Sequence, residues 1–311
     1  MGHEPNDFGD EFAPVVDYAA LDLLLSDQVT FRFGTPVTSL FNFRGYSDGA
    51  ATQGNPLIGN SPIDFVTAET GVQLIGSFDN ASFDFTVTSP TFFETFAPGT
   101  GLSILGKLRL TPNEQFRIGA GVGLGTNGGT AERGNLDAVN WITGDGENYS
   151  AAGLGQPNRY THAYLLPGAQ PIMLQLDTRL QNQLAEVDVW GGIGFEKYSF
   201  AIGGDPVTPR QSGGALIEED SQMWWVGGTV KLNASEQFFV AGRASYAANS
   251  SDWASELDET GLFRIQVGVG VSFWERALWK LEFVSQDEGV NSPGQVGANW
   301  YGVLTELSLA F

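Results

Sequence analysis

Histidine and serine are the residue types from which hydrolytic chemistry could be built in this chain. Only two histidines are present, His3 and His162, and there is no cysteine. A Ser–His hydrolase would have to use His162, in the stretch NRYTHAYLLPG, with a serine such as Ser150 brought near it by folding. Nothing in the spacing supports that arrangement, and we interpret His162 as a loop histidine. The sequence predicts no catalytic residue, so we expect a protein that is not an enzyme.

Carboxylates and glycines offer three further candidate sites. Glu186 and Asp188 are two residues apart and share one face of a strand, where two wall charges are a simpler interpretation than an acid–base pair. The stretch GDGENYS (144–150) carries oxygen ligands but lacks the spacing of a calcium loop. The stretch GVGLGTNGG (121–129) lacks the Lys-Ser/Thr and the following helix of a phosphate-binding loop. We therefore predict no metal site and no cofactor.

The composition narrows the class of partner. The 311 residues include 36 acids and 15 bases, for a net charge of −21, which argues against nucleic acid as a partner. The absence of cysteine excludes disulfides and thiolate metal sites. No apolar run of about 18 residues is present, so no transmembrane helix is predicted. The start, Met1–Glu4, has no signal-peptide character, and we expect that a signal peptide has been removed.

Apolar residues recur at every second position along much of the chain. In FRIQVGVGVSF (263–273) the odd positions are apolar, and the even positions are polar or glycine. This alternation predicts a β-strand with two different environments on its two faces. Similar segments recur, each roughly 9–12 residues long, which suits a tilted strand that crosses a bilayer and exceeds the roughly 5–6 residues of soluble strands.

Charges inside these segments fall on the polar face of each strand. An Arg or Lys that faced lipid at the bilayer midplane would cost about 2–4 kcal/mol, so a membrane barrel would place these charges inside. The core of a soluble sandwich excludes charge as well, so this pattern alone does not separate the two. In a barrel, the predicted lining of the interior comprises Arg32, Glu69, Asp84, Lys107, Arg109, Arg117, Glu186, Asp188, Lys231, Arg243, Arg264, Lys280, Glu282 and Glu306.

Three further features favour the membrane barrel. The polar faces are rich in Gly, Ala and Ser, which suit a crowded interior. Short turns alternate with long polar stretches near 45–66, 90–100, 126–170, 204–222, 247–260 and 285–299. Aromatic residues collect at strand ends, as in the interfacial girdles of membrane proteins. The predicted interfacial aromatics are Trp224, Trp225, Phe273, Trp274, Trp279, Trp300, Tyr301 and Phe311.

The last strand carries a resemblance to a known class. It reads Tyr301-x-Val303-x-Thr305-x-Leu307-x-Leu309-x-Phe311 and ends on a bare aromatic residue. This resembles the C-terminal signal by which Gram-negative outer-membrane β-barrels are recognised for insertion. The resemblance implies an outer-membrane location, the lipid bilayer and the barrel-insertion machinery as partners, short turns in the periplasm and long loops outside.

The predicted fold is all-β: a transmembrane, antiparallel, up-and-down β-barrel of about 12 strands. The segments are 28–43, 67–78, 82–90, 101–110, 115–125, 184–195, 198–204, 223–232, 237–247, 262–273, 277–285 and 300–311. Residues 172–180 also alternate, but the phase changes after Gln181-Asn182-Gln183, which we interpret as a bulge or an extended strand. A further strand at 19–25 makes 14 strands the alternative. An even count would leave both chain ends in the periplasm.

Two units are expected, with different functions. Residues 28–311 form the barrel, and the acidic residues 1–27 form either a periplasmic leader or a plug in the lumen. The predicted function is a porin-like channel for passive diffusion of small hydrophilic solutes or ions through a mixed-charge lumen. The alternatives are a closed structural or interaction barrel that displays acidic loops, an outer-membrane hydrolase, and a soluble double-sheet protein. A homo-oligomer is compatible with each membrane form.

Overall fold

One large antiparallel sheet contains most of the residues that the structure describes. The computed structural model describes residues 19–34, 36, 38–40, 42, 55–58, 66–67, 71–88, 102–126, 170–201, 216–251, 260–273, 277–289 and 300–309. Within these ranges every regular element is a strand. No helix in the described part of the chain is long and apolar enough to cross a membrane.

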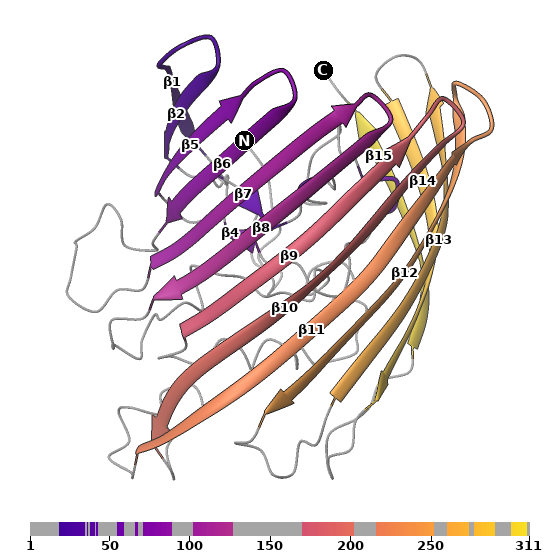
Figure 1. Cartoon of the computed structure of the whole chain (residues 1–311). Coiled ribbons are helices and arrows are strands. Elements are labelled where there is room, and N and C mark those ends of the chain that lie inside the picture. The colour runs from indigo at the N-terminus through magenta and orange to yellow at the C-terminus, as the bar shows by residue number, and fades with distance from the viewer. Residues whose placement is uncertain are drawn as a thin grey trace, which may run out of the picture.

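Thirteen strands follow one another in chain order across this sheet, each antiparallel to the next (Figure 1). They are β1 (Ala20–Leu24), β2 (Val29–Gly34), β5 (Gly71–Ser77), β6 (Ala81–Thr88), β7 (Leu102–Asn113), β8 (Phe116–Thr126), β9 (Gln170–Gln181), β10 (Ala185–Ala201), β11 (Leu216–Asn233), β12 (Phe238–Ser251), β13 (Thr260–Phe273), β14 (Ala277–Gly289) and β15 (Trp300–Leu309). A separate pair joins β3 (Thr38–Ser39) to β4 (Val66–Thr67). The up-and-down, all-β barrel architecture predicted from the sequence is confirmed.

Turn chemistry explains why the strands reverse where they do. In the β9–β10 turn, the Asn182 side-chain oxygen accepts hydrogen bonds from the N–H groups of Leu184 and Ala185, both 2.9 Å long. Asn113 does the same in the β7–β8 turn, and the hydroxyls of Ser26 and Ser235 act similarly in two others. These local bonds replace the backbone pairing that a tight turn loses. The short turns gather at one end of the sheet, which we call the turn end (upper end in Figure 1).

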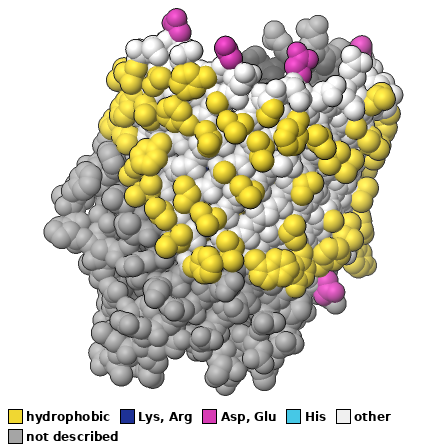
Figure 2. All heavy atoms as spheres, in the orientation of Figure 1, with side chains coloured by type: hydrophobic (Ala, Val, Ile, Leu, Met, Phe, Trp, Pro, Cys, Tyr) yellow, Lys and Arg dark blue, Asp and Glu magenta, His cyan; other side chains and the backbone are white. Residues whose placement is uncertain are grey.

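The burial pattern is the reverse of that of a soluble protein. Along β9, Leu174 and Leu176 are 48% and 62% exposed, whereas Gln175 and Asp177 are 3% and 4% exposed. The same inversion runs through β12, β13 and β14. Hydrophobic side chains cover the outer face in Figure 2, where no Lys or Arg is visible among the described residues. An apolar face of this extent needs a hydrocarbon solvent, so the sheet is built for a bilayer.

The sheet has 13 described strands, within the predicted range of about 12 to 14, but several strand boundaries differ from the prediction. Two predicted segments merge into one strand, and two strands are added, one of which is β9, formed by residues 170–181. The strand predicted for residues 28–43 ends as β2 at Gly34. Segments 184–195 and 198–204 belong to one continuous strand, β10. No turn occurs at Glu196-Lys197, where one was expected, because both residues pair with β9 and with β11. β11 begins at Leu216, inside the stretch expected to be a loop. Residues 20–24 pair with β2 as β1, as the 14-strand alternative anticipated, so the sheet starts before residue 28.

Two of the aromatic residues grouped by the prediction face opposite ways. Trp224 is 44% exposed on the outer face, but its neighbour Trp225 is 3% exposed and lies inside, so the interfacial assignment of Trp225 is wrong. Successive residues of a strand point to opposite faces, and adjacent tryptophans cannot both reach lipid. Phe273 and Tyr301 are exposed at 41% and 79%, and Trp279 lies on the outer side, where it donates a hydrogen bond to Thr305. Trp274, Phe311 and the Trp300 side chain lie outside what the structure describes.

Candidate functional site: the barrel interior and its inner segment

The predicted interior charges that the structure describes lie on the face of the sheet opposite the apolar one. Paired strands place them side by side, as in the registers of Arg32 with Gln73, Asp84 with Lys107 and Glu186 with Lys231. Six are buried, namely Asp84, Asp188, Arg243, Arg264, Lys280 and Glu282. Seven are partly buried, namely Arg32, Lys107, Arg109, Arg117, Glu186, Lys231 and Glu306. Glu69, His162 and the stretch 144–150 lie outside the described residues.

Most of these charges are neutralised by a neighbour on the adjacent strand. Arg179 of β9 holds Asp188 of β10 through its Nε and a second nitrogen, at 2.6 and 2.8 Å, and lies 3.3 Å from Glu186. Lys280 of β14 lies 3.0 Å from Glu306 of β15. A two-pronged Arg–carboxylate pair, like that of Arg179 with Asp188, fixes side-chain geometry as well as neutralising charge. The wall is therefore a rigid, nearly neutral surface at these points.

A second network covers β11 to β14. Arg243 donates from Nε to the Thr229 hydroxyl, at 3.0 Å, and its guanidinium lies 5.9 Å from the centre of the Trp190 ring. Gln266 donates from Nε2 to Glu282 Oε1 at 2.9 Å. Arg264 donates to the side-chain oxygen of Gln286. The buried charged groups of these strands, Arg243, Arg264, Lys280 and Glu282, each have a polar partner, as buried charge requires.

Part of the connection between β2 and β5 lies inside the barrel rather than outside it. We call its described residues, 38–40, 42, 55–58 and 66–67, the inner segment. Leu40, Asn55 and Leu57 in it are at most 1% exposed. The stretch 45–66 was expected to be an outer loop, and for residues 55–58 this prediction is wrong. These residues lie inside because their backbone and side chains form hydrogen bonds with the wall.

One contact of the inner segment is with the wall formed by β7, β8 and β9. Asn42 donates from its backbone N–H and from Nδ2 to the two carboxylate oxygens of Asp177, at 2.6 and 2.7 Å. Arg109 donates to the Asn42 carbonyl at 3.5 Å. The close approach depends on glycine: a Cβ built on Gly119 would lie 2.5 Å from the Asn42 side chain, and one on Gly121 would lie 2.8 Å from the carbonyl of Leu40.

The other contact is with β12, β13 and β14. The N–H of Ile58 donates to Glu282 Oε2, and Arg243 donates to the side-chain oxygen of Asn55, both at 2.5 Å. Leu57 packs in an apolar cluster with Phe239 and Ala241. In the sheet order two strands, β10 and β11, separate this wall from β9. The inner segment therefore joins two separate parts of the wall and reduces the open cross-section of the interior.

Space remains at the turn end. One cavity of about 460 Å³ is lined by residues of β5 to β9, including Arg109, Arg117 and Arg179. A second, of about 700 Å³, lies among the turns and inward residues from Glu114 to Asn233, with Glu186 and Lys231 in its lining. The only charged side chains in the first lining are arginines, whereas the second lining is mixed in charge.

Several interior residues were not predicted from the sequence. Gln175, Asp177 and Arg179 all lie inside, with Asp177 holding the inner segment and Arg179 holding Asp188. Their signal was present, because they alternate with Leu174, Leu176 and Leu180, which are exposed on the outer face. Reading this stretch as one strand with its own polar face would have identified them. Asn42 and Asn55 carried no comparable signal.

The apolar outer belt, the charged interior and the alternation of short turns with long connections together define an integral outer-membrane β-barrel. No family model matches the chain, and no curated protein matches it. Solved structures do match. The expressed outer-membrane OmpT of Vibrio cholerae is 10% identical, with a TM-score of 0.53 over 88% of this chain and 71% of that one.

Two porins are similar to the same extent. A porin of known structure is 11% identical, with a TM-score of 0.51, and the match covers 92% of this chain and 79% of the porin chain. The anion-selective porin from Comamonas acidovorans is 12% identical with a TM-score of 0.52, over 94% of this chain and 77% of its own. At these identities the likeness concerns the fold. The predicted porin-like class and outer-membrane location are confirmed at that level.

Proposed function

We propose that this protein is a passive channel for small hydrophilic solutes or ions, and not an enzyme. The observation that carries the proposal is the polar interior, which keeps cavities of about 460 and 700 Å³ at the turn end. In a barrel of about eight strands side chains fill the interior, whereas the 13 strands described here enclose a wider one. The inner segment narrows this interior, so the cargo is small.

The inner segment also favours the second candidate, a closed structural barrel. Arg264, Gln266 and Lys280 are at most 2% exposed, so the interior beside β13 and β14 is filled. A channel needs a path past the inner segment, and a closed barrel does not. Conductance separates the two functions.

The test is single-channel recording in planar lipid bilayers. We expect discrete conductance steps from the intact chain, and larger steps from the variant Asn42→Ala/Asn55→Ala, because it lacks the side-chain bonds to Asp177 and Arg243. Asn80→Ala is the matched control, since Asn80 is exposed in the β5–β6 turn, away from the inner segment. The absence of conductance from the intact chain and from both variants would refute the channel and favour the closed barrel.

Three partners belong to the same proposal. Lipid covers the apolar belt, and the strand that ends the chain, including the exposed Val303 and Leu307, serves the barrel-insertion machinery. Small solutes occupy the interior. A homo-oligomer stays a prediction, which cross-linking in native membranes tests. The leader or plug predicted for residues 1–27 also stays a prediction, except for residues 20–24, which form β1 of the sheet.

A further inference from the structure

Two interior arginines, Arg109 and Arg117, differ from the others in how few hydrogen bonds they make among the described residues. Among the described residues, Arg109 of β7 makes one long hydrogen bond, to the Asn42 carbonyl at 3.5 Å, and Arg117 of β8 makes none. The Nε atoms of both are buried without a hydrogen-bond partner among the described residues. By contrast, Arg32 is bound to Asp22, and Arg179 is bound to Asp188.

This arrangement is destabilising without a further component. A buried N–H without an acceptor is rare in folded proteins and calls for a water molecule or an ion. Arg117 also lies directly across the ladder from Arg179, so two guanidinium groups occupy one pair of positions. Like charges in cross-strand pairs repel. An anion between these groups would remove both problems.

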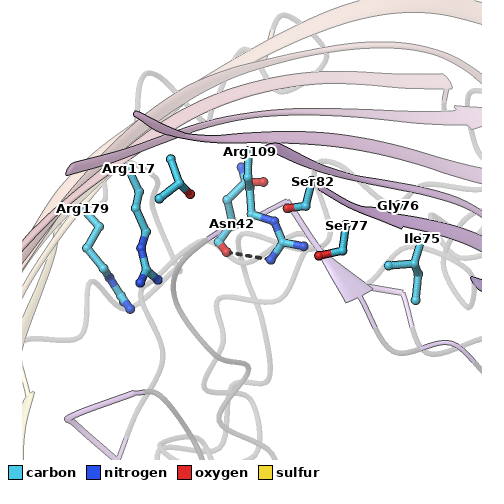
Figure 3. Close-up of a pocket in the computed structure, with 9 residues that line it drawn as sticks. Asn42, Ile75, Gly76, Ser77, Ser82, Arg109, Arg117 and Arg179 are labelled. Atoms are coloured by element: carbon cyan, nitrogen blue, oxygen red, sulfur yellow. Dashed lines mark hydrogen bonds between the residues drawn. The ribbon is translucent and has the colours of Figure 1, made fainter. Parts of the chain in front are cut away.

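The three arginines line a cavity of the right kind. Their side chains extend side by side from the wall into the interior (Figure 3). The cavity has a volume of about 460 Å³, and the hydroxyls of Ser77, Ser82 and Thr111 are also in its lining. Figure 3 shows Ser77 and Ser82 on the side of Arg109 away from Arg117. Among the described residues, no acidic side chain lies in this lining, so the charged groups that they offer to a solute are all positive.

We propose that this cavity binds a tetrahedral oxyanion, either free phosphate or the phosphate of a small ester. Asp188 and Glu186 both lie beside Arg179, so the three arginines exceed these two carboxylates by one positive charge, which favours an anion. Planar guanidinium groups bind phosphate oxygens in pairs, and the hydroxyls supply further donors. The role of the site in solute passage rests on the proposed channel function, but binding itself does not require conduction.

The test is isothermal titration calorimetry of the full chain in detergent micelles with inorganic phosphate. We expect saturable binding by the intact chain, at least a tenfold loss in Arg109→Gln/Arg117→Gln, and unchanged affinity in Arg32→Gln, whose guanidinium is bound to Asp22 outside the cavity. Arg109→Lys/Arg117→Lys keeps the charge without the planar fork and should lose affinity partly. Circular dichroism confirms that each variant is folded.

The outcomes separate this proposal from the channel. Equal affinity of the intact chain and the folded double Gln variant, or no binding by the intact chain, would overturn the site. Glycerol phosphate, titrated in the same way, distinguishes the two sources: binding at least as tight as that of phosphate points to an ester, and weaker binding to the free ion. Phosphate binding without conductance would uphold the site and refute the channel, and conductance without phosphate binding would do the reverse.

Discussion

The claim that lipid covers the outer face predicts a large difference between two Leu→Arg substitutions on one hairpin. Leu176 is 62% exposed near the middle of β9, and Leu184 is 73% exposed in the β9–β10 turn. A guanidinium at the bilayer midplane costs about 2–4 kcal/mol, whereas near the interface the cost falls to about 0–1 kcal/mol. Leu176→Arg should therefore destabilise the folded barrel by about 2–3 kcal/mol more than Leu184→Arg, which is roughly a 30- to 150-fold change in the folding equilibrium.

The measurement is reversible unfolding by denaturant in phospholipid vesicles, followed by tryptophan fluorescence. Both side chains are exposed in the folded chain and both substitutions are the same, so loss of packing contributes little to the difference. If the two free energies of unfolding agree within about 0.5 kcal/mol, the outer face of β9 does not meet hydrocarbon, and the membrane assignment loses its physical basis.

Two further predictions concern the interior. Gly192→Leu should destabilise the barrel by about 1–3 kcal/mol in the same assay, because a Cβ at Gly192 would lie 2.2 Å from the Trp225 ring and must displace it; an unchanged midpoint would contradict the packing. Asp188→Asn should lower the free energy of unfolding by about 3 kcal/mol, the low end of the range for a broken buried ion pair. The loss is at the low end because Glu186 still lies 3.3 Å from Arg179. A loss below about 1 kcal/mol would show that Glu186 alone neutralises Arg179.

The fold could be predicted because it follows from a local rule, the alternation of side chains along a strand. The one hairpin that was missed shows the limit of that rule. The phase change at 181–183 marks a turn, not a bulge, and the turn is made by Asn182 accepting two backbone N–H groups. A bulge and a tight turn both shift the phase of an alternating pattern, so the pattern alone does not distinguish them.

The inner segment could not be predicted for a different reason. Its bonds join residues far apart in the chain: Asn42 and Asp177 are separated by 135 in sequence number, and Ile58 and Glu282 by 224. The glycines that admit it, such as Gly119, fit equally well as small residues of a crowded interior. Contacts between the segment and distant strands decide that this connection lies inside.

Exposed and buried charge should contribute unequally to selectivity. Acidic residues stand in the turns at the turn end, namely Asp27, Asp79, Glu114 and Glu236, all exposed, and acidic side chains are visible along the upper rim in Figure 2. Their field is screened by salt within about 8–10 Å. The Nε atoms of Arg109 and Arg117 are buried behind that rim, where screening is weaker and electrostatic interactions are stronger. In the proposed channel, the acidic surface alone would therefore not make the interior cation-selective, and the two arginines should determine which small ions the interior favours.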